Sequence, residues 1–297
     1  MTHPLLDLEL NELLERNRGL KDRHLGERCF ILATGPSIKK QNLKLLQGET
    51  CFALSNFFVH PDYWFINPRY YSIAPFHYPP FTEEVWHSWM REVSAGTRNA
   101  TMFFGLTDRE RNLKNGLFEN RESYFVRLQD GLVIQHCDLT RPIPAPWTAP
   151  IMVLPIAIYM GFREIYLLGC DHDWILHLHE STHFYEESQH ACVRGGTDMW
   201  VDSQKSGYME GQCRHLILLW QQYRMLQAVA HSKGIQIINA TTGGILDVLP
   251  RVKFESLFDA SRLALYPTSS SRERVDVQPS IPTKSKSSEM FFMDDSL

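Results

Sequence analysis

A short acidic and histidine-containing run follows one of the most apolar segments of the chain. The segment 164–169 (EIYLLG) has the composition of a buried strand, and Asp171, His172 and Asp173 follow it after a single cysteine. Two carboxylates and an imidazole at the end of a strand could hold a divalent cation, orient a hydroxyl or contact a ribose. If the strand continued, Asp171 and Asp173 would lie on the same side of it.

The same polar segment contains five histidines in all: His172, His177, His179, His183 and His190. A histidine can act as a general base near neutral pH, and histidines can also bind metals. Their spacing matches no zinc-binding pattern, so a tightly bound transition metal is not expected. We expect one of these histidines to serve as a catalytic base.

A second candidate lies in the stretch FILATGPSIKK, residues 30–40, where an apolar run stops at Thr34, Gly35, Pro36 and Ser37. Gly35 permits a sharp turn or a close backbone approach, and Pro36 suits the first turn of a helix that Ser37 could cap. Free backbone N–H groups at such a turn favour an anion. The same turn also occurs without a ligand, and both interpretations stay open for these residues alone.

Polar residues follow two further predicted strands and precede one predicted helix. Asn56 follows the second strand and Asn67 the third, and Thr148 precedes the helix that begins at Ala149. Asparagine can contact ribose hydroxyls or a base edge, although it is also a common turn residue. Thr148 can cap its helix, with Pro150 tolerated in the first turn, and the helix start would be a second position that favours an anion.

The elements that must position these residues alternate along the chain. The predicted strands are 29–33, 51–55, 63–66, 101–104, 124–127, 164–169 and 235–239, and the predicted helices are 82–93, 149–160 and 208–232. Continuous apolar strands separated by helices indicate an α/β fold, a doubly wound, mainly parallel Rossmann-like sheet with helices on both faces. Ligands of such sheets bind outside the carboxyl ends of the strands, where the predicted site residues lie.

The chain divides into a short amphipathic helix, one large domain and a tail. Residues 1–27 carry the helix, 28–266 the Rossmann-like nucleotide-binding domain, and 267–297 a Ser-, Pro- and charge-rich tail that we expect to be disordered. Within the domain, residues 171–204 form a long polar loop of the kind that covers an active site as a lid.

Composition narrows the class of protein. The formal net charge of −4 over 297 residues argues against a nucleic-acid partner. The six cysteines show no metal-binding spacing and indicate buried, reduced thiols. No apolar run approaches the roughly 18 residues of a membrane span, and the first residues do not resemble a signal peptide. We therefore expect a cytoplasmic protein, at most peripheral to the inner membrane face.

The order of these motifs resembles a known group. A strand followed by GPS, an asparagine after strand two, Asn-Pro after strand three, a Thr-headed helix ending in GFREIYLLG and a following Asp look like the bacterial CMP-sialic-acid sialyltransferases. The pattern is equally similar to Maf-type glycosyltransferases and to 6-hydroxymethylpterin diphosphokinase-like proteins. The stretch INATTGGILDVLPRVKFESLF, residues 238–258, also looks like the end of many relatives from surface-polysaccharide loci. The resemblance spans about residues 29–258, in short motifs.

The resemblance implies a nucleotide and donor site made of Thr34, Gly35, Pro36, Ser37, Asn56, Asn67, Thr148, Ala149 and Asp171. Ala149 stands where the family has a serine, which puts binding of the sugar carboxylate in doubt. Asp173 stands where the sialyltransferases place a tyrosine that stabilises the leaving phosphate, a role that an aspartate could fill only through Mg²⁺. The implied base is a loop histidine, His183 or His190.

These implications lead to a glycosyltransferase as the expected function. Its partners would be a nucleotide-sugar donor, a CMP-activated acidic sugar, and a glycan acceptor, with no tightly bound cofactor. One alternative is an ATP-dependent pyrophosphate transfer resembling the pterin kinases, with Mg²⁺ at Asp171 and Asp173. Another is a nucleotide-binding protein without catalytic activity.

Overall fold

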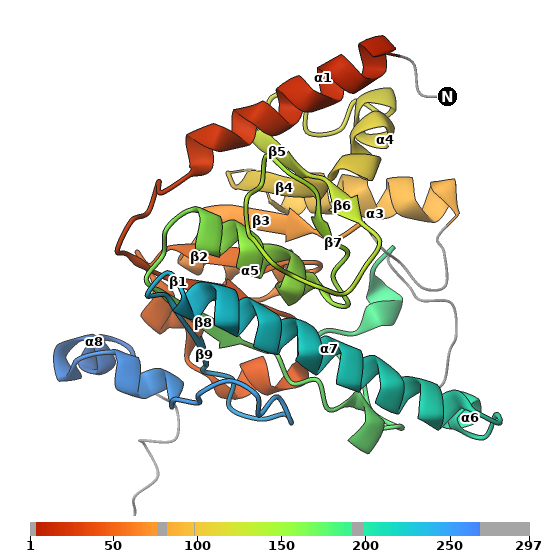
Figure 1. The fold of residues 1–297 in the computed structure, drawn as a ribbon. Coiled ribbons are helices and arrows are strands. Elements are labelled where there is room, and N and C mark those ends of the chain that lie inside the picture. The colour runs from red at the N-terminus through yellow and green to blue at the C-terminus, as the bar shows by residue number, and fades with distance from the viewer. Residues whose placement is uncertain (1–3, 76–81, 98, 192–198, 268–297) are drawn as a thin grey trace, which may run out of the picture. The chain divides into compact units, whose positions relative to one another are not determined.

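The computed structural model describes residues 4–75, 82–97, 99–191 and 199–267. Within these residues, seven strands form one parallel sheet in the order β5-β4-β3-β2-β1-β8-β9 (Figure 1). Their bounds are β1 Arg28–Leu32, β2 Cys51–Leu54, β3 Tyr70–Ile73, β4 Thr101–Gly105, β5 Ser123–Val126, β8 Glu164–Leu168 and β9 Gln236–Asn239. Two short strands, β6 Leu128–Gln129 and β7 Ile143–Pro144, pair separately. The predicted doubly wound parallel sheet is confirmed.

Helices connect these strands. The α-helices are α1 Pro4–Glu15, α2 Tyr63–Ile66, α3 Glu83–Gly96, α4 Arg109–Lys114, α5 Ala149–Tyr159, α6 Met199–Ser203, α7 Tyr208–His231 and α8 Ala260–Leu265. Short 3-10 helices are η1 Arg16–Leu20, η2 Pro36–Lys40, η3 Leu43–Leu46, η4 Phe57–Val59, η5 Leu106–Asp108, η6 Trp174–Leu176, η7 Glu187–Gln189 and η8 Phe254–Leu257. None of the described helices is long and apolar enough to cross a membrane.

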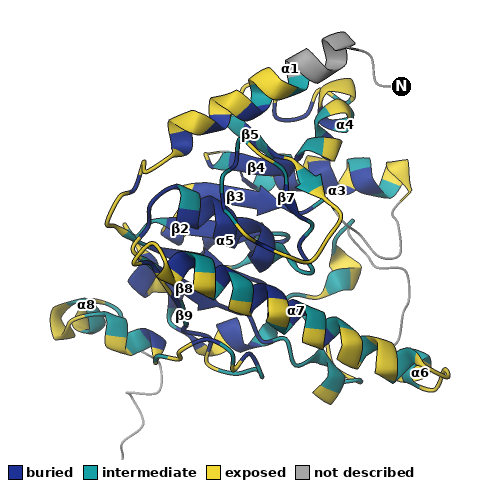
Figure 2. Ribbon diagram, viewed as in Figure 1, coloured by how far each residue is buried: buried dark blue, intermediate teal, exposed yellow. Residues whose placement is uncertain are grey.

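Both faces of the sheet are covered. Along β1, Cys29 and Ile31 belong to one hydrophobic cluster, and Phe30 and Leu32 belong to another. This alternation is what a strand gives when both of its faces are buried. Helices α5 and α7 pack on the first cluster and α3 on the second, so the strands are buried between helical layers (Figure 2).

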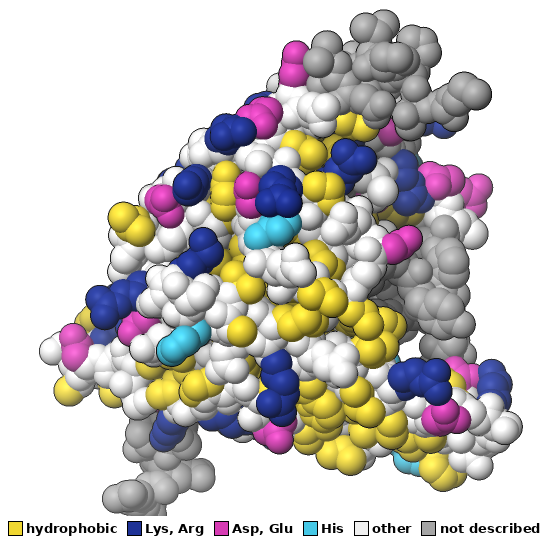
Figure 3. Space-filling view, in the orientation of Figure 1, with side chains coloured by type: hydrophobic (Ala, Val, Ile, Leu, Met, Phe, Trp, Pro, Cys, Tyr) yellow, Lys and Arg dark blue, Asp and Glu magenta, His cyan; other side chains and the backbone are white. Residues whose placement is uncertain are grey.

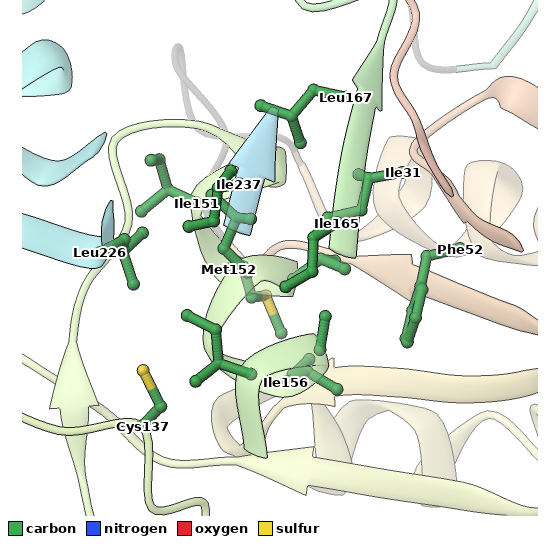
Figure 4. Close-up of a cluster of buried hydrophobic side chains, with 14 of the residues drawn as sticks. Ile31, Phe52, Cys137, Ile151, Met152, Ile156, Ile165, Leu167, Leu226 and Ile237 are labelled. Carbon is green, nitrogen blue, oxygen red and sulfur yellow. The ribbon is translucent and has the colours of Figure 1, made fainter. Parts of the chain in front are cut away.

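Helix α5 is buried on every side. All residues from Pro150 to Ile158 are buried, because α5 lies between β1, β2 and β3 on one side and α7 on the other. Figure 4 shows Ile151, Met152 and Ile156 of α5 in one cluster with strand residues such as Ile165. Full burial of a large aliphatic side chain contributes about 1.5–3 kcal/mol, so this helix is held rigidly against the sheet.

One predicted strand is a helix. Residues Tyr63–Ile66 form α2, and the third strand is Tyr70–Ile73, which the sequence analysis missed. Tyr63 and Ile66 are buried whereas Trp64 and Phe65 are exposed, which is the spacing of one helical turn. A run of four apolar residues is too short for its composition to distinguish the helical repeat of 3.6 residues from the strand repeat of two.

The other predicted elements agree with the structure to within a few residues, except at the N-terminus. The predicted amphipathic helix ends at Glu15, where the chain continues as the 3-10 helix η1. Residues up to Tyr266 form one compact unit. The predicted tail lies outside the described residues from position 268 onward. Residues 192–198 of the predicted lid also lie outside the described residues. Of the described cysteines, four are buried and Cys213 is exposed, and all are free.

Candidate functional site

The strand order reverses at β1, which pairs with β2 on one side and with β8 on the other. The connections that leave the carboxyl ends of two such strands run to opposite faces of the sheet. The space between them is the usual ligand site of a doubly wound sheet. The turns after β1, β8 and β9 meet there. We call residues 33–37, 169–172 and 240–245 the Asp171 junction.

Backbone hydrogen bonds tie the three turns of the Asp171 junction together. The Gly35 N–H donates to the Gly169 carbonyl at 2.9 Å, and the Ile245 N–H donates to the Asp171 carbonyl at 2.9 Å. The Cys170 N–H donates to Oγ1 of Thr241 at 3.1 Å. Backbone groups and the Thr241 hydroxyl therefore join all three turns.

Glycines allow this close packing. A Cβ atom on Gly35 would overlap Asp171 Oδ2 and the Gly169 carbonyl oxygen, and one on Gly244 would overlap the backbone of Asp171. Gly35 has φ −62°, a value open to any residue, so space and not backbone conformation requires glycine there. The prediction of a close backbone approach at Gly35 is confirmed. At Gly244, both the lack of space and the left-handed backbone, with φ +73°, require glycine.

The side chain of Asp171 is the buried polar centre of the junction. It is 5 % exposed, and burial raises the pKa of its carboxyl; nearby Ser37 groups oppose this shift and Asp173 adds to it. Among the described residues, neither Asp171 Oδ2 nor Ser37 Oγ has a partner with hydrogen-bond geometry. Buried polar atoms in this state call for a further partner, such as an ordered water, an ion or a ligand.

The turn after β1 differs in detail from its prediction. Residues Pro36–Lys40 form only a five-residue 3-10 helix, with Gly35 and not Ser37 in the N-cap position and no side-chain cap. This helix is therefore too short for its dipole to create an anion site. The hydroxyl of Thr34 faces a histidine instead, with Oγ1 3.0 Å from His183 Nδ1.

His183 lies in the predicted lid, and the structure brings it to the turn after β1. Besides its contact with Thr34, its Nε2 lies 3.4 Å from Glu187 Oε1. The Phe184 N–H donates to the Thr34 carbonyl at 2.9 Å, which fixes the lid segment at this point. His190 lies elsewhere, with Nδ1 3.7 Å from Glu92 Oε2 on α3.

The run Asp171-His172-Asp173 does not continue as a strand. β8 ends at Leu168, and His172 adopts a left-handed backbone with φ 52°. The condition under which Asp171 and Asp173 would share one side of a strand is therefore not met. Asp173 Oδ2 lies 3.5 Å from His177 Nε2, and His172 Nε2 lies 2.8 Å from the Tyr223 hydroxyl.

Magnesium fits this arrangement poorly. The Asp173 carboxylate already faces His177, with its Oδ2 3.5 Å from Nε2. Across the described residues there is no group of three or more His, Cys, Asp and Glu side chains that could hold a metal ion.

His172 is a neutral residue at physiological pH. Burial, with a contribution from His215, lowers its pKa to about 3. Its ring contacts Tyr223, whose hydroxyl lies near Thr148 at the start of α5. Thr148 occupies the N-cap position as predicted, but its side chain makes no cap bond, and its buried Oγ1 has no partner within the described chain. Ala149 is the first residue of α5.

The two predicted asparagines have different environments. Asn56 follows β2 as predicted, is fully buried, and accepts a hydrogen bond from Trp89 Nε1 at 2.6 Å, which anchors α3. Asn67 does not follow a strand: it is the exposed left-handed C-cap of α2 and precedes β3. Because the sheet is parallel, this position is not at the carboxyl ends of the strands, and the premise for Asn67 is wrong.

The sequence analysis did not select the turn after β9. Gly243 and Gly244 close the junction, and Arg251 donates to the carbonyls of Thr241 at 2.9 Å and Gly243 at 2.6 Å. The TTGG run within residues 238–258 was the available signal, because paired glycines after a strand mark a tight turn.

A large cavity lies away from the Asp171 junction. Its volume is about 750 Å³, and its lining includes Gly26, Arg163 and Ile235, which precede β1, β8 and β9. It is therefore at the amino edge of the sheet, opposite the junction.

Comparisons with known proteins give few matches. No family model and no curated protein matches the chain. Among solved structures, the sialyltransferase CstII from Campylobacter jejuni in complex with CMP-3FNeuAc is similar at 12% identity and a TM-score of 0.42, over 76% of this chain and 86% of that chain. A variant of sialyltransferase Cst-II in complex with CMP gives 11% identity and a TM-score of 0.41 over the same shares. At these values the likeness does not by itself establish an activity.

Proposed function

We propose that the protein is a glycosyltransferase that binds its nucleotide-sugar donor at the Asp171 junction. The donor is a CMP-activated acidic sugar, such as a sialic-acid-like nonulosonate, and the acceptor is a glycan hydroxyl in surface-polysaccharide assembly. The observation that carries the proposal is the contact between His183 and Thr34, which brings an imidazole from the polar lid to the turn after β1.

The donor phosphate is bound by hydrogen-bond donors at the carboxyl edge of β1 and β8. Ser37 Oγ and Thr148 Oγ1 are both buried without a partner among the described residues, and a hydroxyl can donate to a phosphate oxygen. Thr148 also heads α5, whose N-terminal N–H groups favour negative charge. These groups stabilise the charge that develops on the leaving nucleotide.

The Asp171 carboxyl accepts hydrogen bonds from the nucleoside. A carboxylate repels a phosphate, whereas it pairs well with ribose hydroxyls. Its burial next to the glycine turns supports this assignment, because a bound hydroxyl would satisfy the unpartnered Oδ2.

His183 takes the proton of the acceptor hydroxyl in a single, inverting displacement. The new bond joins the acceptor oxygen to the anomeric carbon as the bond to the nucleotide phosphate breaks, and the electron pair leaves with the nucleotide. His183 is favoured over His190 because it contacts the turn after β1, whereas His190 contacts Glu92 of α3. General base catalysis of this kind contributes about 10²–10⁴-fold.

Thermal shift measurements with CMP, CDP, UDP, GDP and ATP, each with and without Mg²⁺, test the proposal. We expect CMP to stabilise the protein, by about 2.7 kcal/mol at a concentration 100 times its Kd. Stabilisation by ATP with Mg²⁺ and by no pyrimidine nucleotide would instead support the pyrophosphate-transfer alternative. Binding of CMP without transfer from any CMP-activated acidic sugar would support a binding protein.

The variant Asp171→Asn separates binding from folding. Burial raises the pKa of this carboxyl, so its charge costs stability at pH values above that raised pKa, and asparagine removes this cost. We expect the variant to fold at neutral pH but to bind CMP about tenfold more weakly, a loss of about 1.4 kcal/mol. The matched control is Asp108→Asn, since Asp108 is also buried, with its pKa raised by burial to about 6, and lies after β4. Equal loss of CMP binding in both variants would contradict the site.

A further inference from the structure

The contacts of His183 involve both ring nitrogens, and this decides which of them can accept a proton. Nδ1 lies 3.0 Å from the Thr34 hydroxyl, and Nε2 lies 3.4 Å from the Glu187 carboxylate. A neutral imidazole carries one N–H and one lone pair, so one nitrogen donates and the other accepts.

The two partners are not equivalent. A carboxylate can only accept a hydrogen bond, whereas a hydroxyl can donate or accept. A lone pair on Nε2 would face the negative charge of Glu187, and an N–H there satisfies both groups. The Thr34 hydroxyl can then rotate to donate to Nδ1.

We infer that Glu187 is a positioning residue that holds His183 in the Nε2–H tautomer, so that Nδ1 is the basic nitrogen of the site. This inference rests on the proposed function for its catalytic meaning. In the reaction, the acceptor hydroxyl replaces that of Thr34 on Nδ1 and gives its proton to that nitrogen. Thr34 marks the position of the incoming hydroxyl.

The remaining surroundings of His183 support an oriented ring. Tyr185 stacks on it with ring centroids 5.1 Å apart and an interplanar angle of 3°. Beyond Tyr185 lie His190 and Glu92, which pair with each other at 3.7 Å. Glu187, at the start of η7, pairs directly with the His183 ring, so a change at this residue should act on His183 first.

Nitrogen NMR of the full chain tests the tautomer without any assay of activity. Protein labelled with ¹⁵N-histidine is titrated from about pH 5 to about pH 9, and the His183 signals are assigned by their loss in His183→Gln. We expect the neutral ring to carry its proton on Nε2. A neutral ring protonated on Nδ1 would overturn the inference while leaving the proposed function untouched.

The variant Glu187→Gln removes the charge but keeps an oxygen that can accept from Nε2. Loss of a nearby negative charge disfavours the imidazolium, so the ring titration and the acid limb of the kcat profile should both move to lower pH, by on the order of one unit. Glu187→Ala also removes the acceptor, and we expect kcat to fall about tenfold or more with CMP binding unchanged. An unmoved titration in Glu187→Gln would overturn the inference.

The control is Glu186→Gln, the same change one residue earlier, at an exposed glutamate whose carboxylate accepts from Ser188. We expect it to leave the titration of His183 unchanged. A wild-type rate that falls with rising pH across the His183 titration would mean that the ring acts as an acid on the leaving group, which contradicts the inference. Absence of transfer from every donor would instead count against the proposed function, and the NMR result would still stand.

Discussion

The two edges of the parallel sheet offer different kinds of site. At the carboxyl edge, the Asp171 junction is tightly packed, and two of its polar atoms, Ser37 Oγ and Asp171 Oδ2, are buried without partners within the described chain. At the amino edge, a cavity of about 750 Å³ is lined by Lys21, Arg163 and Lys233, all exposed, with fewer acidic side chains. On the face of the molecule seen in Figure 3, Lys and Arg side chains are interspersed with Asp and Glu.

The direction of the helices separates the two edges further. Helix α5 has its N-cap, Thr148, at the carboxyl edge and ends at Tyr159, which lines the amino-edge cavity. Helix α7 ends at His231, directly before the lining residue Ser232. Helix N-termini favour anions and C-termini favour cations. The lysines of the cavity therefore complement two helix ends, whereas the junction has donors left for a phosphate. Buried polar atoms and helix direction therefore favour the junction for the proposed nucleotide site, although the large cavity lies at the amino edge.

The largest expected effect comes from adding one methyl group at the junction. Gly35→Ala places a Cβ on Asp171 Oδ2 and the Gly169 carbonyl, so the turns must separate. We expect the free energy of unfolding to fall by about 3 kcal/mol, measured by urea denaturation. The control is Gly19→Ala in η1, where a Cβ would meet nothing within 4 Å. If both variants were equally stable, the junction would not be as closely packed as described.

The sequence predicted the sheet better than it predicted the junction. Buried strands such as 29–33 are continuous apolar runs, and their type does not depend on distant contacts. The segment Tyr63–Ile66 failed because four apolar residues fit one helical turn as well as a strand. Asn67 was misplaced with it, since its assignment depended on a strand ending there.

Contacts between residues far apart in the chain could not be predicted from the sequence. The pairing of Thr34 with His183 joins residues 149 positions apart, and no local pattern selects His183 over His190. The role of Gly244 against Asp171 likewise depends on β9 and β8 being neighbours. Local composition identified the residue types at the site, whereas their pairing is set by the tertiary fold.

A second prediction concerns acid stability and contrasts His172 at the carboxyl edge with His136 at the amino edge. The pKa of His172 is lowered by burial to about 3 from an ordinary 6.5, so the unfolded chain binds a proton that the folded protein excludes. Stability is therefore fully present above pH 6.5 and is lost as the pH falls towards 3. The full shift corresponds to at most about 5 kcal/mol, and we expect about 2 kcal/mol because the residue as a whole is only half-buried.

Urea unfolding at a series of pH values measures this loss. His172→Asn tolerates the left-handed backbone and should flatten the loss of stability between pH 6.5 and about 3. His136→Asn should flatten it less, because His136 has its pKa lowered by partial burial and by Arg141, against an opposing effect of Asp138. An unchanged slope in His172→Asn would show that the histidine is not buried in its neutral form.

The smallest expected effects come from the lysines of the amino-edge cavity. Lys21 and Lys233 are exposed, so Lys21→Ala and Lys233→Ala should each change the free energy of unfolding by no more than about 0.5 kcal/mol. Their charges act at helix C-termini, where a nucleotide phosphate gains little, so the thermal shift produced by CMP should match that of the unchanged protein. Loss of that shift in the variant that carries both lysine changes, with Asp171→Asn still responding to CMP in full, would show that the nucleotide binds at the amino edge. The comparison of the two edges would then be reversed.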